Sequence, residues 1–152
     1  MKLYRLVILF CMAIVLYLGR TFTDVGMDWY AGLAKPTLTP QGIWFAIVWV
    51  TIYMLIAICL MRIWREKFPG YAGITWIFAL NGILNVAWSY LFFTKQLMGW
   101  AFVDLVLLWI TICWIIAWLK KWGRKEYWLI LPYALWVAFA GYLNLGFLLL
   151  NS

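Results

Sequence analysis

Residues 127–150 read YWLILPYALWVAFAGYLNLGFLLL, an apolar stretch without a single Asp, Glu, Lys or Arg. An α-helix needs ~20 such residues to cross the ~30 Å hydrocarbon core of a bilayer. Inside that core the backbone must satisfy its own hydrogen bonds, and a continuous apolar run of this length does so as a helix. The stretch therefore predicts a transmembrane helix.

Four more apolar runs precede this one along the chain. They cover approximately residues 4–18, 43–61, 73–93 and 98–119. A lipid-facing β-barrel would instead show shorter segments of alternating hydrophobicity. We therefore predict an all-α integral membrane protein, a five-transmembrane-helix bundle in which residues 1–152 form a single membrane domain. The longest connection, residues 19–42, is predicted to be a loop.

The first run is the shortest, and a signal peptide is the alternative to a retained helix there. Lys2 and Arg5 precede an apolar stretch of signal-peptide length. However, no clear small-x-small cleavage site follows it, because residues 17–20 read YLGR. We favour a retained first helix.

The composition excludes a soluble domain. Hydrophobic residues make up 68% of the chain and charged residues 11%, whereas soluble domains average ~45–50% and ~25%. The excess apolar surface must face lipid, so the bilayer is the expected partner. A net charge of +7 would suit nucleic acid only on a soluble scaffold. We therefore expect lipid headgroups, and no nucleic acid, to meet the basic residues.

The basic residues also predict the orientation of the chain. Five crossings place nine of them on the side of the N-terminus: Lys2, Arg5, Arg62, Arg65, Lys67, Lys120, Lys121, Arg124 and Lys125. The opposite side carries three: Arg20, Lys35 and Lys95. Because Lys and Arg concentrate in cytoplasmic loops, we expect a cytoplasmic N-terminus and an external C-terminus. This asymmetry fits a bacterial inner membrane.

Several kinds of catalytic and metal site have no support in the sequence. The chain contains no histidine, which removes the usual general base, metal ligand and haem ligand. Cys11, Cys59 and Cys113 lie within apolar runs and show no CxxC spacing, so neither a zinc site nor a disulfide framework is indicated. We expect no metal and no required cofactor. Any chemistry would use aromatic side chains, a bound ligand or light.

Three of the predicted helices each carry a stripe of aromatic and polar side chains, because residues four apart share one helix face. The stripes are Phe45, Trp49 and Tyr53; Asn81, Asn85, Trp88, Ser89 and Phe92; and Trp136, Ala140 and Asn144. Amide side chains in hydrocarbon normally face the bundle interior. Hydrogen bonds between helices would explain the asparagines taken singly. Beside aromatic rings, they also suit a flat apolar ligand with a few polar groups.

Asp104 is the only charged residue well inside a predicted span. An intramembrane carboxylate is a candidate functional residue, as a proton relay, a ligand contact or a buried hydrogen-bond acceptor. No second carboxylate accompanies it in any span, so a proton-coupled pump is poorly supported. Among thirteen tryptophans, those near helix ends suit interfacial belts. Trp49, Trp88, Trp109 and Trp136 lie deeper, and each needs a partner for its indole N–H or a cavity to line.

Three segments of the chain match motifs of one known family. Residues 29–40 read WYAGLAKPTLTP and resemble the W-Y-x-x-L-x-K-P-x-W-T-P-P signature of the translocator protein family. Its members are also called tryptophan-rich sensory proteins and peripheral-type benzodiazepine receptors. Residues 81–89, NGILNVAWS, resemble N-x-x-x-N-x-x-W-S, and residues 132–144, PYALWVAFAGYLN, resemble P-Y-x-x-W-x-x-F-A-x-x-L-N. The three matches fall in order across nearly the whole chain and are highly specific together.

The resemblance implies a five-helix bundle, usually a homodimer, with a ligand pocket that the first loop covers as a lid. Family ligands include protoporphyrin IX and other tetrapyrroles, sterols in some members, and synthetic benzodiazepine-type drugs. Matching positions around that pocket are Tyr30, Pro40, Phe45, Trp49, Tyr53, Asn85, Trp88, Asp104, Trp136 and Ala140. Trp49 and Trp136 match tryptophans implicated in light-dependent porphyrin degradation by bacterial members, which makes them candidate catalytic residues.

The chain departs from the family pattern in two places. Leu38 and Gln41 stand where the loop signature has a Trp and a second Pro, which predicts a looser lid. After Asn144 the chain lacks the Tyr and the basic residue of the sterol-recognition pattern. We therefore do not expect a sterol to be the natural ligand.

These observations predict a membrane receptor that binds tetrapyrroles, with protoporphyrin IX as its ligand, and drug-like molecules in an aromatic pocket within the bundle. Light-dependent degradation of the bound porphyrin is the enzymatic hypothesis. Transport of porphyrins or other small hydrophobic molecules is the alternative. A protein that only packs helices, without saturable ligand binding, is the remaining hypothesis.

Overall fold

The computed structural model describes residues 3–152. Lys2, which contributes to the predicted orientation, lies outside the described residues. The helices in chain order are α1 (Leu3–Val25), α2 (Met27–Ala31), α3 (Gly42–Glu66), α4 (Tyr71–Ser89), η1 (Tyr90–Thr94), α5 (Met98–Lys121) and α6 (Tyr127–Leu150). Residues 3–152 contain no β-strand. Five segments are long and apolar enough to cross a membrane: α1, α3, α4 with η1, α5 and α6. The prediction of an all-α five-helix membrane bundle is confirmed.

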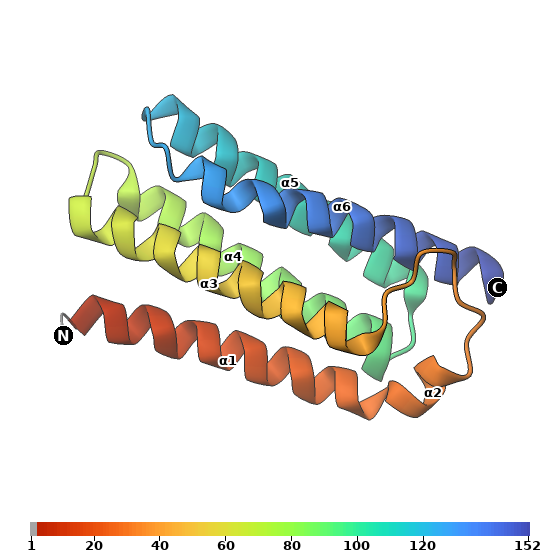
Figure 1. The fold of residues 1–152 in the computed structure, drawn as a ribbon. Helices are drawn as coiled ribbons and strands as arrows, with labels where there is room; N and C mark the ends of the chain where they lie inside the picture. The colour runs from red at the N-terminus through yellow and green to blue at the C-terminus, as the bar shows by residue number, and fades with distance from the viewer. Residues whose placement is uncertain (1–2) are drawn as a thin grey trace.

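The five long helices run alternately up and down in chain order, so the two termini lie at opposite ends of the bundle (Figure 1). The closest neighbours are α5 with α6 and α4 with α5. Helix α1 packs on α3, α4 and η1, and α3 also packs on α6. Buried Ile and Leu side chains such as Ile63, Ile112 and Leu119 fill the space between the helices. Apolar side chains that stay exposed, including Trp76 and Leu135, face outward and contact the lipid bilayer.

The first helix is longer than the sequence pattern indicated. It continues past residue 18 and ends at Val25. The hydroxyl groups of Thr21 and Thr23 donate hydrogen bonds to the carbonyl oxygens of Tyr17 and Gly19, a bond that lets a hydroxyl residue remain within a helix. Much of the segment predicted as a loop over 19–42 is therefore helical, since α2 follows directly. Apart from Gly26, which separates α1 from α2, only residues 32–41 of this segment, called the lid from here on, lack helical structure.

The end of α4 changes from α-helical to π-helical geometry at η1. The backbone N–H of Lys95 donates to the carbonyl oxygen of Tyr90 at 2.9 Å, a bond that spans five residues. This wider turn places both Phe92 and Phe93 inside the bundle, at 2% and 5% exposure. Single π-turns of this kind occur frequently at functional sites.

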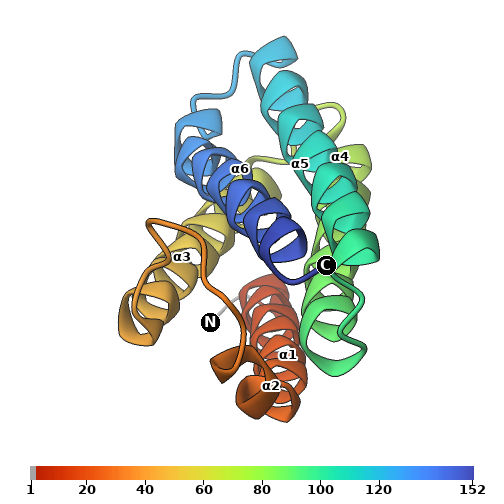
Figure 2. The ribbon, with the colours of Figure 1, turned by 90° about the vertical axis from the view of Figure 1, so that its right-hand side faces the viewer.

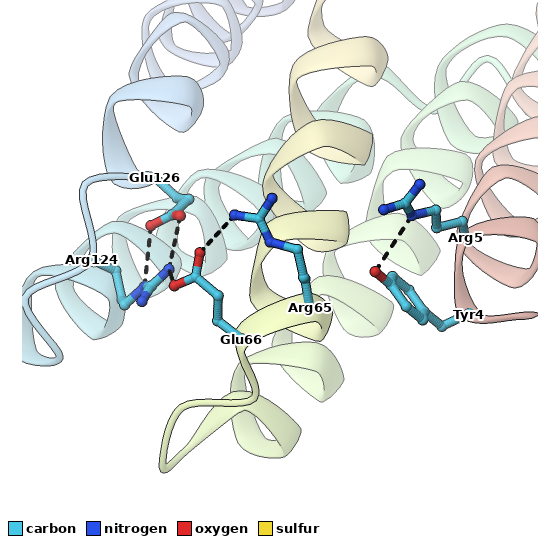
Figure 3. Close-up of polar contacts among 6 residues, drawn as sticks. All are labelled: Tyr4, Arg5, Arg65, Glu66, Arg124 and Glu126. Carbon is cyan, nitrogen blue, oxygen red and sulfur yellow. Dashed lines mark hydrogen bonds and ion pairs between the residues drawn. The ribbon is translucent and has the colours of Figure 1, made fainter. Parts of the chain in front are cut away.

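A charged cluster joins α3 to the start of α6 at the end of the bundle where the chain begins (Figure 3). Arg124 forms an ion pair with Glu66 and hydrogen bonds of 2.9 and 3.2 Å to Glu126. Arg65 pairs with the other oxygen of Glu66 at 3.0 Å. The guanidinium of Arg124 also lies 5.4 Å from the ring centre of Phe68. This cluster ties the α3–α4 turn to the α5–α6 turn at the end of the bundle away from the lid.

Candidate ligand-binding cavity

A cavity of about 840 Å³ lies at the lid end of the bundle, between α1, α3, α4 and α6. Its aromatic lining consists of Tyr17, Tyr30, Phe45, Trp49, Tyr53, Trp88, Phe92, Phe93 and Phe147. Seen from the lid end, α2 and the lid lie in front of the space between these helices (Figure 2). Functional ligand sites typically enclose about 300–1,000 Å³ with mostly apolar walls and a few polar groups, and this cavity has that size and character.

One wall of the cavity is a ladder of aromatic rings on α3. Phe45, Trp49 and Tyr53 recur every four residues and therefore share one helix face. Neighbouring ring centres along this ladder lie 6.2 and 5.7 Å apart. Tyr53 is buried, whereas Phe45 and Trp49 are half-buried. The ladder thus offers flat apolar faces to the interior of the cavity.

The opposite wall is an aromatic cluster that the π-helical turn assembles. Tyr30 of α2 lies with its ring centre 5.5 Å from Phe93 and 5.2 Å from Phe147 of α6. Phe92 packs against Trp88 with ring centres 5.6 Å apart. The Tyr30 hydroxyl is neutral at physiological pH, and burial raises its pKa further above the usual value. Rings from α2, α4, η1 and α6 therefore form one continuous apolar surface.

The deep end of the cavity is a chain of hydrogen bonds through the centre of the bundle. The Tyr53 hydroxyl donates to Asn85 Oδ1 at 2.5 Å, and Asn85 Nδ2 donates to the Tyr133 hydroxyl at 3.2 Å. Tyr133 in turn donates to Asn81 Oδ1 at 3.1 Å, and Asn81 Nδ2 donates to Thr111 at 2.8 Å. The network joins α3, α4, α5 and α6, so it fixes the positions of Tyr53 and Asn85 where they line the cavity.

A second polar group beside the cavity is built on Asn144 of α6. The indole N–H of Trp88 donates to Asn144 Oδ1 at 3.1 Å, and Asn144 Nδ2 donates to the carbonyl oxygen of Met98 at 2.8 Å. Asn144 is only 1% exposed. These bonds supply the partner that a deeply placed indole requires, and they orient the Trp88 ring along the cavity wall.

The lid is held on the end of α6 by side-chain hydrogen bonds. Asn151 accepts from the backbone N–H of Ala34 at 2.9 Å and donates to its carbonyl oxygen at 3.0 Å. The hydroxyl groups of Thr37 and Tyr142 lie 2.9 Å apart. Pro36 is buried between these two anchors. The lid therefore has a fixed course over the cavity, with Pro40 among the lining residues.

The structure brings most of the sequence-predicted site residues together. Tyr30, Pro40, Phe45, Trp49, Tyr53, Asn85, Trp88 and Ala140 all line the cavity. The other two predicted residues, Asp104 and Trp136, are not among its lining residues.

Trp136 lies on the far side of Phe45, whose ring centre is 5.5 Å from that of Trp136. It lines a separate groove of about 400 Å³ between α3 and α6, together with Pro132 and Phe139. The indole N–H of Trp136 is buried and has no hydrogen-bond partner among the described residues. Trp136 is therefore connected to the cavity lining through its contact with Phe45.

Asp104 lies on α5 and is 7% exposed. Its Oδ2 atom has no hydrogen-bond partner within residues 3–152. The position on α5 separates it from the cavity, because no α5 residue lines that space. As a result, a direct contact between this carboxylate and a molecule in the cavity would require the helices to move.

Several lining residues were missed by the sequence analysis. Phe147 follows Ala140 and Asn144 at helical spacing, so the α6 stripe already indicated it. Phe93 gave no such signal, because an α-helix that turns Phe92 inward would turn the next residue away. The charged residues Arg20, Asp24 and Lys35 also border the cavity. In the described part of the chain, no group of three His, Cys, Asp or Glu side chains could hold a metal ion.

Comparison with known proteins places the chain in a family. The family model described as TspO/MBR matches residues 7–150. The chain belongs to the TspO/MBR family. A tryptophan-rich protein TspO from Bacillus cereus is 31% identical over 144 residues, which cover 95% of this chain and 94% of that protein. A protein of the same name from Archaeoglobus fulgidus is 34% identical, with 90% and 89% covered.

Animal proteins are also similar to this TspO/MBR chain. The translocator protein of Sus scrofa is 37% identical over 130 residues, which cover 83% of this chain and 76% of that protein. Membership of the TspO/MBR family supports a receptor-type role in the membrane. The aromatic cavity is the place in the described structure where such a receptor could hold a ligand.

Proposed function

We propose that this TspO/MBR protein is a membrane receptor that binds tetrapyrroles such as protoporphyrin IX, and flat drug-like molecules, in the cavity beneath the lid. The main support for this proposal is that two aromatic walls of the cavity are joined by a short polar floor. Rings on α3 face rings on α2, η1 and α6, and the amides of Asn85 and Asn144 lie between them. A planar macrocycle would stack on these rings while its few polar atoms meet the amides.

The test is a titration of the detergent-purified protein with protoporphyrin IX, followed through the absorbance of the porphyrin. The variant Trp49→Phe removes part of the α3 ladder and should weaken binding roughly five- to tenfold. The matched control is Trp76→Phe, because Trp76 is 77% exposed on α4 and does not line the cavity. Equal affinities for the wild type and Trp49→Phe would contradict the proposed site.

One observation favours a second function, the light- and oxygen-dependent degradation of the bound porphyrin. The rings of Trp49, Phe45 and Trp136 lie in sequence from the cavity to the α3–α6 groove, with centres 6.2 and 5.5 Å apart. The bound porphyrin would absorb the light, and the tryptophans at the two ends of this series of rings could then be oxidised one after the other. Illumination of the complex in air should bleach the porphyrin faster than free porphyrin in the same detergent. Equal bleaching rates would rule this function out.

The proposed receptor would be oriented with its N-terminus in the cytoplasm of a bacterial cell, and two copies would associate as a homodimer. The orientation is supported by the basic residues of the α3–α4 and α5–α6 turns, and the dimer by the family resemblance. An alkaline phosphatase fused after Ser152 should be active, since that enzyme folds only outside the cytoplasm. The mass of the protein in lipid nanodiscs checks the dimer.

A further inference from the structure

The mouth of the cavity carries all of its charged lining residues. Arg20 and Asp24 reach it from α1, and Lys35 reaches it from the lid. The side chains of Arg20 and Asp24 are 81% and 57% exposed. The remaining lining residues are uncharged. The cavity is therefore divided into an uncharged, mostly apolar interior and an entrance with two cations and one anion.

We infer that Arg20 and Lys35 form a carboxylate-receiving site at this entrance, and that the cavity selects anionic amphiphiles over their uncharged analogues. This inference rests on the proposed function and specifies its ligand class. The apolar, flat part of the ligand enters between the rings, while its carboxylate groups remain at the mouth. The two cations then determine which end of the ligand enters first.

The interior offers no equivalent place for a carboxylate. The hydroxyl of Tyr53 and the indole N–H of Trp88 already donate to Asn85 and Asn144. Each of these two amides also donates one N–H, to Tyr133 and to the carbonyl oxygen of Met98, which leaves one neutral N–H on each amide and no cation in the interior. An ionised group buried without a cation is strongly disfavoured. A carboxylate-bearing ligand is consequently stable only with its acid groups at the mouth.

The lid cation is well placed for this role. The hydrogen bonds between Asn151 and Ala34 fix the backbone next to Lys35. The Lys35 ammonium lies 5.3 Å from the ring centre of Tyr30, whose phenol is neutral at physiological pH and whose pKa is raised further by burial. None of the ion pairs among residues 3–152 involves Lys35. Its positive charge is thus uncompensated in the described structure.

The positive charge of Arg20 on α1 is partly compensated by a neighbouring carboxylate. Removing that carboxylate should therefore strengthen the binding of an anionic ligand, whereas removing either cation should weaken it. Arg20 Nε donates to Asp24 Oδ2 at 3.2 Å, one helical turn away. Asp24 competes with an arriving carboxylate for the guanidinium and also repels it. Replacing Asp24 with Asn removes both effects, so it should strengthen the binding of an anionic ligand. Structural damage would not produce such a gain.

The experiment compares protoporphyrin IX, which carries two carboxylates, with its uncharged dimethyl ester. Both are titrated against the full chain in a neutral detergent, so that no anionic lipid competes for the cations. For each ligand, the affinity of every variant is compared with that of the wild type. This comparison cancels the different partitioning of the two ligands into micelles. The variants are Arg20→Gln, Lys35→Gln, the double variant and Asp24→Asn. The control is Lys95→Gln, because Lys95 lies 5.4 Å from the ring centre of Tyr90 but does not line the cavity.

For the acid we expect roughly threefold weaker binding in each single variant and about tenfold in the double variant, as for exposed ion pairs. Asp24→Asn should bind the acid about twofold more tightly. Added salt should weaken the binding of the acid but not that of the ester. The ester should bind all variants alike. Saturable binding of both ligands without any dependence on these residues would overturn the inference and leave the proposed function standing. Failure of both ligands to saturate would overturn the proposed function itself.

Discussion

Gly146 of α6 lies directly against Pro36 of the lid. A Cβ atom at position 146 would come within 2.7 Å of the Pro36 Cβ and 2.8 Å of its Cγ. Pro36 is buried, and its ring is rigid, so it could not avoid such an atom by rotating a side chain. The absence of a side chain at Gly146 is therefore what allows the lid to lie flat on α6.

The variant Gly146→Ala should displace the lid from the end of α6. Accommodating one extra methyl group in a packed contact costs about 1–3 kcal/mol, and here the lid is the part that can move. Residues 32–41 should then exchange their amide hydrogens faster, and a bound porphyrin should dissociate several-fold faster. Hydrogen–deuterium exchange and stopped-flow dissociation measure the two effects.

Gly141→Ala is the matched control for this variant. Gly141 lies on the same helix, and a Cβ there would meet nothing within 4 Å. The substitution should leave exchange in the lid unchanged, and helix propensity favours Ala by up to about 1 kcal/mol. Faster lid exchange in both variants would mean that helix α6, and not the contact with Pro36, is responsible.

The hydrogen-bond network beneath the cavity predicts a loss of stability in Tyr133→Phe. The hydroxyl of Tyr133 accepts from Asn85 and donates to Asn81, and Tyr133 is 2% exposed. Removing it leaves two buried amide groups each short of a partner, which should cost about 1–3 kcal/mol in the free energy of unfolding. Unfolding in mixed micelles with increasing SDS measures this change.

A suitable comparison is Tyr127→Phe, at the start of α6. Tyr127 is half-buried, and its hydroxyl makes no hydrogen bond among the described residues. Its ring contacts with Trp128 and Lys120 would persist in Phe. The unfolding free energy of this variant should stay near that of the wild type. A similar loss in both variants would show that the network contributes nothing beyond the packing of an aromatic ring.

The sequence was sufficient to predict the five helices and the faces that enclose the cavity. The spacing of Phe45, Trp49 and Tyr53 placed them on one face, and the same argument applied to Asn85 and Trp88. Uninterrupted apolar runs determine helices because hydrocarbon leaves the backbone no alternative. The cavity-lining faces could be predicted since polar and aromatic residues at helical spacing are rarely left facing lipid.

Other features depend on contacts that no local pattern records. The inward position of Phe93 results from a π-turn, in which the backbone N–H of Lys95 donates a hydrogen bond to the carbonyl oxygen of Tyr90. This turn packs against α1 and α2, which are distant in sequence. The resemblance placed Trp136 at the pocket, whereas in the structure Trp136 lines a neighbouring groove and contacts the cavity-lining Phe45. The extension of α1 to Val25 was hidden because Gly19, Arg20 and Asp24 read as the start of a polar loop.

The separation of Trp49 from Trp136 predicts that binding and photochemistry respond differently to substitution. Trp49→Phe changes the cavity wall and should lower both the porphyrin affinity and the rate of bleaching. Trp136→Phe changes a residue outside the cavity lining and should leave the affinity within about twofold, since it removes no direct contact. If Trp136 takes part in electron transfer through Phe45, Trp136→Phe should still bleach a saturating porphyrin more slowly than the wild type does. An equal loss of affinity in both variants would contradict the arrangement of the three rings.

The charged cluster at the opposite end of the bundle predicts that Arg124 contributes to stability and not to binding. Glu126 is 6% exposed, and Arg124 is its ion-pair partner in the described structure (Figure 3). In Arg124→Gln this carboxylate would remain buried without a cation, which should cost about 1–3 kcal/mol in the free energy of unfolding.

Arg65→Gln is the control, because its pair with Glu66 is solvent-exposed and such pairs contribute little. The SDS unfolding curve should therefore shift for Arg124→Gln alone, while the porphyrin affinity of both folded variants stays unchanged. A loss of affinity in folded Arg124→Gln would instead indicate that this end of the bundle is coupled to the cavity.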